Sequence, residues 1–224
     1  MSTKKIGIVG WKTGENSFGA TAPYMEFLSK LGDVIVLPPT ETVFELDLLV
    51  LPGGKDTLSY NYGQVPSFYN TDPDLMKEFF LLNNLKKYVE NRTPIFGICL
   101  GFQMLNVHFG GKLVQNCWHE QSEKSRSELV HEIKFTPEYY QLRNALFEKK
   151  TKKEYKVNSM HHQGVLVGEL AEPLKCIAYH EEIVEVMEHT ELPIAGVQYH
   201  PEEIYDSLSS FLIQNLLELK EVTK

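Results

Sequence analysis

Residues 96–105 read FGICLGFQML, and this stretch decides the fold. An apolar strand over Pro94–Ile98 meets a helix at Cys99, which has one glycine two residues before it and another two residues after it. This G-x-C-x-G layout is typical of a nucleophile on a sharp strand-to-helix turn, where larger flanking side chains would collide with the strand and the helix. The N-terminus of the following helix favours a thiolate, because its unpaired amides and its dipole are positive there. A buried structural cysteine beside two incidental glycines is the alternative.

A second motif, near the C-terminus, favours the interpretation of Cys99 as a nucleophile over that of a structural cysteine. Residues 196–202 read GVQYHPE and continue the apolar stretch Leu192–Val197. His200 can take the thiol proton and return it to a leaving amine, and Glu202 can hold the imidazole in the required tautomer. The intervening proline fixes one backbone torsion, so a spacing of two residues can bring both side chains to one side of a short turn. The two motifs together predict a triad of Cys99, His200 and Glu202, against the alternative of an ordinary turn that contains a histidine and a glutamate.

Hydrophobic patterning predicts the fold class. Strands are expected at Lys5–Val9, Val34–Leu37, Leu46–Leu51, Pro94–Ile98, Lys112–Gln115, Leu129–Phe135, Glu154–Asn158, Lys175–Ala178, Ile183–Met187 and Ile194–Gln198. Helices are expected at Thr21–Leu31, Leu75–Glu90, Gly101–Phe109 and from about Glu202 to Leu219. Strands that alternate with helices predict an α/β fold with a mostly parallel central sheet, helices on both faces and extra strands toward the C-terminus.

Length and composition narrow the function classes. The 224 residues are expected to form a single domain over 1–224 with a substantial core. The net charge of −8 disfavours a nucleic-acid surface, and no apolar run is long enough to cross a membrane. The first residues run directly into a strand, so no signal peptide is expected. Three widely spaced cysteines favour a reducing, cytoplasmic compartment over a disulfide framework.

Three motifs in this order carry a family resemblance: LPGG at residues 51–54, the Cys99 turn, and the His200–Glu202 segment. Together they resemble the class I glutamine amidotransferase family, which includes glutaminase subunits and γ-glutamyl hydrolases of the peptidase C26 type. The resemblance spans most of the chain and implies a flavodoxin-like sheet with a Cys-His-Glu triad. It implies no metal and no organic cofactor.

The glycine turn after the strand over Leu46–Leu51 has a role by resemblance. Ligands of open parallel sheets bind at the carboxyl ends of the strands, where this turn, Cys99 and His200 are all expected. In the family, such a turn supplies one N–H to an oxyanion hole. The resemblance therefore implies that the N–H groups of Gly54 and Leu100 hold the oxyanion, with Gly53 in the substrate site. A tight turn without a catalytic role is the alternative.

Further substrate contacts are implied by two other segments. Gln103 lies one helical turn after Cys99, and related enzymes use a glutamine there to hold the γ-glutamyl group. Residues 157–164 read VNSMHHQG, and class I domains commonly place a substrate-binding loop here, which implies contacts from Ser159, Met160 and His161. Adjacent strand residues point to opposite faces, so the paired histidines are not expected to bind a metal.

Two segments are expected to play smaller parts. Gly10–Gly19 matches neither a P-loop nor a dinucleotide fingerprint, and it is expected to be a loop over the site. Cys117 and Cys176 lack a comparable turn and are expected to be unreactive thiols.

The resemblance implies a small-molecule substrate, either glutamine or a γ-glutamyl amide, which Cys99 would cleave through a γ-glutamyl thioester. Three hypotheses remain open. The first hypothesis is a free-standing hydrolase, which the sequence at residues 158–163 favours. The second is a glutaminase subunit that passes ammonia to a separate synthetase. The third hypothesis is a catalytically silent binding module on the same scaffold.

Overall fold

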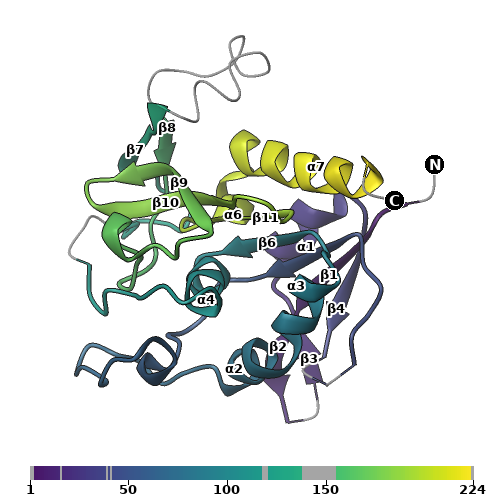
Figure 1. Ribbon diagram of the computed structural model, residues 1–224, viewed down its shortest axis with the longest axis horizontal. Helices are drawn as coiled ribbons and strands as arrows, with labels where there is room; N and C mark the ends of the chain where they lie inside the picture. Colours follow the sequence, from purple (N-terminus) through teal and green to yellow (C-terminus); the bar gives the residue numbers. More distant parts are fainter. Residues whose placement is uncertain are drawn as a thin grey trace.

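A nine-stranded sheet runs through the computed structural model, which describes residues 3–15, 17–38, 40, 42–117, 121–137 and 155–222 (Figure 1). Its order is β4-β1-β5-β6-β11-β10-β9-β7-β8. The strands are β1 (Lys5–Val9), β4 (Asp33–Leu37), β5 (Leu48–Leu51), β6 (Ile95–Ile98), β7 (His131–Phe135), β8 (Tyr155–Val157), β9 (Leu174–His180), β10 (Ile183–His189) and β11 (Ile194–Val197). A separate hairpin contains β2 (Trp11–Gly14) and β3 (Ser17–Gly19). The helices are α1 (Ala22–Ser29), α2 (Leu75–Phe80), α3 (Lys86–Glu90), α4 (Leu100–His108), α6 (Pro201–Ile204) and α7 (Ser207–Val222), and short 3₁₀ turns lie at Ser59–Tyr62 and Val167–Glu169.

The sheet has a parallel half and an antiparallel half. Strands β4, β1, β5, β6 and β11 pair in parallel, and numbered along the chain they follow the order 2-1-3-4-5 of flavodoxin-like sheets. Strands β10, β9, β7 and β8 continue the sheet as antiparallel neighbours. The predicted fold class is confirmed, and the extra strands toward the C-terminus extend the same sheet.

Helices cover both faces of the parallel half (Figure 1). Alternation along β5 divides its side chains between the two faces, so Leu48 and Val50 belong to one apolar cluster while Leu49 and Leu51 belong to the other. The first cluster contains side chains of α1 and α7, and the second contains side chains of α3 and α4. Both faces of the inner strands β1, β5, β6 and β11 are therefore buried, as the continuous apolar runs predict, whereas the edge strand β4 is partly exposed.

Three predicted elements differ from the observed ones. The predicted strand at Lys112–Gln115 is wrong, because only Val114 forms a bridge there, with Gly164. The helix predicted for 75–90 is present but contains a π-helical turn at Leu81–Leu85 between α2 and α3. The closing helix is divided into α6 and α7, because Tyr205 adopts a left-handed conformation (φ 49°) between them. The strand predicted from Glu154 is seen as β8, since Glu154 itself lies outside the described residues.

The antiparallel half contains a buried contact between a histidine and a carboxyl group. The Nε2 atom of His131 lies 3.3 Å from Oε1 of Glu185, and each side chain is 1% exposed. The ring of His131 stacks on that of His180.

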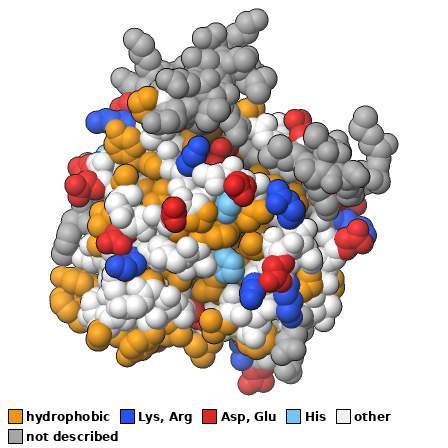
Figure 2. Space-filling view, in the orientation of Figure 1, with side chains coloured by type: hydrophobic (Ala, Val, Ile, Leu, Met, Phe, Trp, Pro, Cys, Tyr) orange, Lys and Arg blue, Asp and Glu red, His pale blue; other side chains and the backbone are white. Residues whose placement is uncertain are grey.

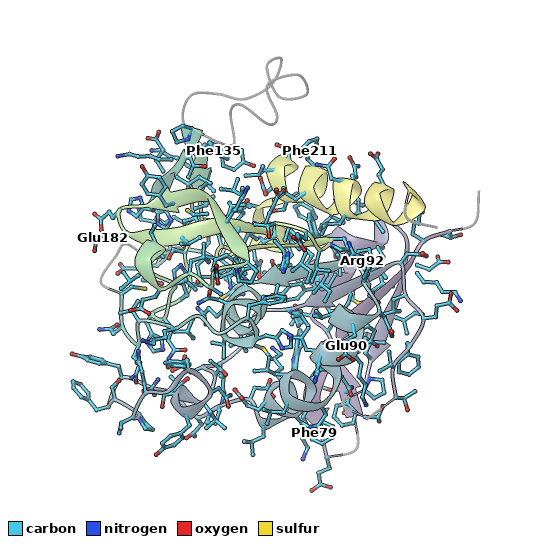
Figure 3. The ribbon with its side chains drawn as sticks, in the orientation of Figure 1. Phe79, Glu90, Arg92, Phe135, Glu182 and Phe211 are labelled. Carbon is cyan, nitrogen blue, oxygen red and sulfur yellow. The ribbon has the colours of Figure 1, made fainter. Side chains whose placement is uncertain are left out.

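Figure 3 shows Glu182 at the outer edge of the antiparallel half, far from Arg92, which follows α3. Acidic and basic side chains are interspersed over the face seen in Figure 2. Among the helices that the structure describes, none combines the length and apolarity needed to span a bilayer.

Candidate active site

The predicted motifs lie at the ends of three neighbouring parallel strands, at one edge of the sheet. Leu51 of β5 is in register with Gly97 of β6, and Ile98 of β6 is in register with Val197 of β11. The glycine turn, Cys99 and His200 directly follow these strands. Segments that lie about 50 and 100 residues apart in sequence therefore meet in space, as the strand-end rule predicts.

Cys99 occupies the strained turn that its flanking glycines predicted. Its backbone has φ 50° and ψ −106°, a combination that non-glycine residues rarely adopt, and its N–H donates to the Val197 carbonyl at 2.9 Å. A Cβ atom on Gly97 would lie 2.7 Å from the backbone nitrogen of Phe102. The helix α4 can therefore start this close to β6 only with glycine at position 97. Cys99 is the N-cap residue of α4, where the helix dipole stabilises a thiolate.

His200 and Glu202 form a buried dyad beside Cys99. The His200 Nδ1 atom lies 2.7 Å from Glu202 Oε1, and the two residues are 5% and 1% exposed. Burial alone lowers the pKa of His200, but the charge of Cys99, a hydrogen bond with Cys99 and the Glu202 carboxylate together raise that pKa to about 10. The histidine is thus a cation at neutral pH for as long as Cys99 is a thiolate.

Asn158 fixes the backbone of the histidine from both sides. Its Oδ1 accepts from the His200 N–H at 2.9 Å, and its Nδ2 donates to the His200 carbonyl at 3.1 Å. The same Nδ2 donates to the Arg126 carbonyl at 2.7 Å. Asn158 is fully buried and joins the antiparallel half to the end of β11.

The glycine turn after β5 packs directly against the dyad. A Cβ atom on Gly53 would lie 2.6 Å from Cε1 of His200, so only glycine fits there. The Gly53 N–H donates to the Tyr24 hydroxyl at 2.9 Å, and Lys77 Nζ donates to the Gly53 carbonyl. Burial, then the charges of Glu202 and Cys99, raise the pKa of Tyr24 well above its usual value.

A cavity of about 870 Å³ opens over this edge of the sheet. Gly53, Gly54 and His200 line its floor, and Met160 is the residue of the predicted substrate loop that reaches it. The predicted loop at Gly10–Gly19 is instead the hairpin β2–β3, whose Trp11 and Lys12 line one wall.

The other predicted substrate residues lie behind the cavity wall. Gln103 is buried, and its Nε2 donates to the Gln163 carbonyl at 2.8 Å and to Gln198 Oε1 at 3.2 Å. Ser159 and His161 are also buried and hydrogen-bond with the loop that follows residue 120. None of these three residues lines the cavity, and their contact with substrate stays a prediction.

Sequence reasoning missed Tyr24, Lys77 and Asn158 as site residues. Asn158 begins the NSMHHQ segment, so its polar character directly after a strand was a usable signal. Tyr24 and Lys77 lie on helices without a recognisable motif. They belong to the site only because α1 and α2 pack beside the glycine turn. Among the described residues, no group of three or more histidine, cysteine or carboxylate side chains is arranged to hold a metal ion.

Comparisons with known proteins show the family and the fold of the chain. The chain is 30% identical over 192 residues to the glutamine amidotransferase-like protein YvdE of Lactococcus lactis subsp. lactis, covering 80% of this chain and 78% of that protein. It is 35% identical over 152 residues to a subunit of the glutamine-hydrolyzing GMP synthase of Thermococcus kodakarensis, covering 67% and 73%. The crystal structure of a GMP synthase subunit from Thermoplasma acidophilum superposes with a TM-score of 0.69 at 22% identity, covering 100% of this chain and 98% of that one, which shows the shared fold.

The family model of Peptidase C26 matches residues 11–202. This match includes all three motifs that carried the resemblance, and it begins at the hairpin that lines the cavity. The chain therefore belongs to the Peptidase C26 family, among the glutamine amidotransferase-like proteins.

Proposed function

We propose that the protein is a cysteine amidohydrolase that cleaves the γ-amide of glutamine or of a γ-glutamyl amide. The observation that carries the proposal is the meeting of Cys99, on its strained turn, with the buried His200–Glu202 dyad, whose histidine lines the cavity. A nucleophile, a proton carrier and an orienting carboxylate are the parts that acyl transfer requires.

In the first half of the reaction, the Cys99 thiolate attacks the γ-carbonyl carbon and forms a tetrahedral oxyanion. The N–H groups of Gly54 and Leu100 hold the oxyanion. Leu100 is the first residue of α4, where backbone N–H groups have no partner within the helix. Collapse of the intermediate breaks the C–N bond, and His200 gives its proton to the departing ammonia or amine. The product at Cys99 is a γ-glutamyl thioester.

The charge balance of the site accounts for the change of role of His200. Acylation removes the charge of Cys99, which is the strongest of the influences that raise the pKa of His200. The pKa of the imidazole therefore falls once its proton has left with the amine. The neutral imidazole then takes a proton from water, and the resulting hydroxide attacks the thioester carbon. The C–S bond breaks, which releases glutamate and restores the Cys99 thiolate beside a protonated His200. Throughout, Glu202 holds Nδ1 so that Nε2 faces the reacting groups.

A free-standing hydrolase is the interpretation we favour. The cavity of about 870 Å³ has room for a leaving group larger than ammonia, and small-molecule sites commonly fall in this size range. A glutaminase subunit is the second candidate, because one relative, at 35% identity, is a component of a glutamine-hydrolyzing GMP synthase. In that case the ammonia would pass to a separate synthetase.

Labelling with 6-diazo-5-oxo-norleucine tests the proposed site. The reagent is expected to modify Cys99 and spare Cys117 and Cys176, as read by peptide mass mapping. Cys99→Ala serves as the control that should lose the label. Modification mainly at another cysteine would contradict the proposal.

A substrate panel then separates the two candidates. The purified chain is mixed with glutamine, γ-glutamyl-p-nitroanilide and several γ-glutamyl amines. A hydrolase is expected to turn over at least one of them alone, with kcat of roughly 1–10³ s⁻¹. A glutaminase component is expected to stay near background until an ATP-dependent partner enzyme completes its site.

A further inference from the structure

Lys77 is a buried cation in the candidate active site to which the proposed reaction gives no task. It lies on α2, is 3% exposed, and lines the cavity beside Gly54. Its Nζ donates to the Gly53 carbonyl, lies 3.8 Å from Asp74 Oδ2, and is positioned 5.0 Å from the centre of the Trp11 ring. A lysine is seldom this deeply buried without a specific partner.

The partner of Lys77 belongs to the peptide group that carries the proposed oxyanion donor. The carbonyl of Gly53 and the N–H of Gly54 are the two ends of one planar unit, and this peptide bond is trans. In a trans peptide the C=O and the N–H point in opposite directions. An ammonium on the carbonyl side therefore leaves the N–H of Gly54 aimed away from Lys77.

We propose that Lys77 is a positioning residue that polarises the Gly53–Gly54 peptide group and strengthens the Gly54 N–H as a donor to the oxyanion, an inference that rests on the proposed function. A charge-assisted hydrogen bond to a carbonyl draws electron density from the amide nitrogen, and hydrogen bonds in series strengthen one another. The same contact prevents the peptide from rotating. Gly53 is held at its other end by the Tyr24 hydroxyl, so both peptide groups of the turn have a fixed orientation.

The surroundings of Lys77 make its charge sensitive to pH. Burial lowers the pKa of Lys77 to about 8, although Asp74 and the charge of Cys99 act to raise it. The other titratable side chains on the same cavity wall are Lys12 from β2, Tyr24 from α1, Lys55, Arg126, His200 and Glu203. Lys77 is thus a cation at neutral pH and loses its charge as the pH rises through about 8.

Steady-state kinetics with γ-glutamyl-p-nitroanilide test the inference. Lys77→Met keeps the length of the side chain but removes the donor, and we expect kcat to fall roughly 10- to 100-fold with KM changed less than threefold. That loss is smaller than the 10²- to 10³-fold expected when an oxyanion donor is removed outright. Lys77→Arg keeps a cationic donor and is expected to restore most of kcat. A Lys77→Met enzyme with the kcat of the wild type would overturn the inference and leave the proposed function standing.

The pH profile supplies a readout that a purely structural lysine would not move. In the wild type, kcat is expected to fall as the pH rises through about 8, and Lys77→Arg should shift this alkaline limb to higher pH. Asp74→Asn removes a carboxylate that raises the pKa of Lys77, so it should shift the limb to lower pH. The matched control Lys55→Met, a lysine on the same wall, should leave the position of the limb unchanged. If Lys77→Met does not fold, the shifts in the Arg and Asn variants decide.

An NMR measurement separates failure of this inference from failure of the proposed function. The Gly54 amide proton of ¹⁵N-labelled protein is expected to shift with a midpoint near pH 8, and the shift should be absent in Lys77→Met. Absence of γ-glutamyl amidase activity in the wild type, both alone and with an ATP-dependent partner enzyme, would refute the proposed function, while the titration would still report on polarisation. A Gly54 signal that does not respond to pH near 8 would overturn the inference whatever the activity.

Discussion

Two cysteine–histidine neighbourhoods lie in different regions of the molecule, and their surroundings differ in almost every respect. Cys99 lies at a parallel strand end and caps a helix, with His200 beside it. Cys117 lies in the connection after α4, with its Sγ 3.9 Å from Nδ1 of His161. The Nδ1 atom of His161 also lies 2.9 Å from the Gln163 carbonyl, so this nitrogen carries a proton and cannot accept one from the thiol.

The electrostatic field separates the two cysteines further. Burial, followed by the negative charge of Glu185, raises the pKa of Cys117 to about 12. At Cys99 the neighbouring ionised partner is a histidine cation, and the helix dipole acts in the same direction. A thiol next to an imidazole is therefore insufficient for a nucleophile. The tautomer of the histidine and the sign of the neighbouring charge also differ between the two sites.

The largest expected effect comes from removing the two thiols one at a time. Cys99→Ala should lower kcat by roughly 10⁶-fold, because loss of a triad nucleophile removes the covalent pathway. Cys117→Ala should stay within about twofold of the wild type, since its thiol donates to a backbone carbonyl, that of His162, outside the dyad. Steady-state kinetics on γ-glutamyl-p-nitroanilide measure both variants. Equal losses in the two variants would refute the distinction drawn between the two sites.

The next effect tests the roles within the dyad. His200→Asn should cost roughly as much as loss of the nucleophile, while Glu202→Gln should cost roughly 10⁴-fold because orientation is only partly lost. His180→Asn is the matched control from the antiparallel half, where the histidine Nδ1 donates to the Glu132 carbonyl at 2.8 Å. It should retain the kcat of the wild type. Near-wild-type rates in His200→Asn would exclude the histidine as proton carrier.

A smaller effect compares the reactivity of the two thiols directly. Cys117 has a pKa of about 12, so its reaction with iodoacetamide should increase with pH up to that value. Cys99, which caps α4 beside His200, should be modified faster than Cys117 at pH 7. Mass mapping after timed alkylation from pH 6 to 10 gives both rates. Faster modification of Cys117 at pH 7 would contradict the electrostatic contrast.

The smallest effect compares two buried asparagines. Asn158→Ala and Asn106→Ala each remove hydrogen bonds to buried backbone, and each should lower the free energy of unfolding by about 1–3 kcal/mol. Only Asn158 holds the backbone of His200, so only that variant should also lower kcat, by roughly 10- to 100-fold. Urea unfolding and kinetics below the transition measure the two quantities. A kcat loss of similar size in Asn106→Ala would show that general loosening, and not alignment of the histidine, is responsible.

Much of the parallel half could be predicted from sequence, because its signals are local. The glycines around Cys99 indicate a close approach of helix and strand, and apolar runs that end at a glycine indicate buried strands. The prediction failed at Lys112–Gln115, where alternating residues look like a strand. There the Gln115 side chain accepts from the Ser67 N–H at 2.8 Å and donates to the Val65 carbonyl at 3.0 Å. Side-chain bonds of this kind to a distant loop leave no local pattern.

The candidate triad could be named from sequence, but the residues that surround it could not. A nucleophile, a base and a carboxylate have few possible chemical identities, and the motif spacing restricts them further. Tyr24 and Lys77 act through backbone atoms of Gly53, so their role depends on how α1 and α2 pack on the turn. That packing is a tertiary property. The position of Gln103 in the helix was predicted, but its hydrogen bonds to Gln163 and Gln198 were not.

The pairing of β6 with β11 has a consequence for how a newly made chain acquires its reactivity. Ile95 is in register with Ile194, so nearly a hundred residues of chain must be synthesised and folded before this contact can form. Contacts between residues so distant in sequence form slowly, because a long loop must close first. Until β11 docks, Cys99 has no His200–Glu202 dyad beside it. The proposed reactivity of Cys99 can therefore appear only after β11 has joined the sheet.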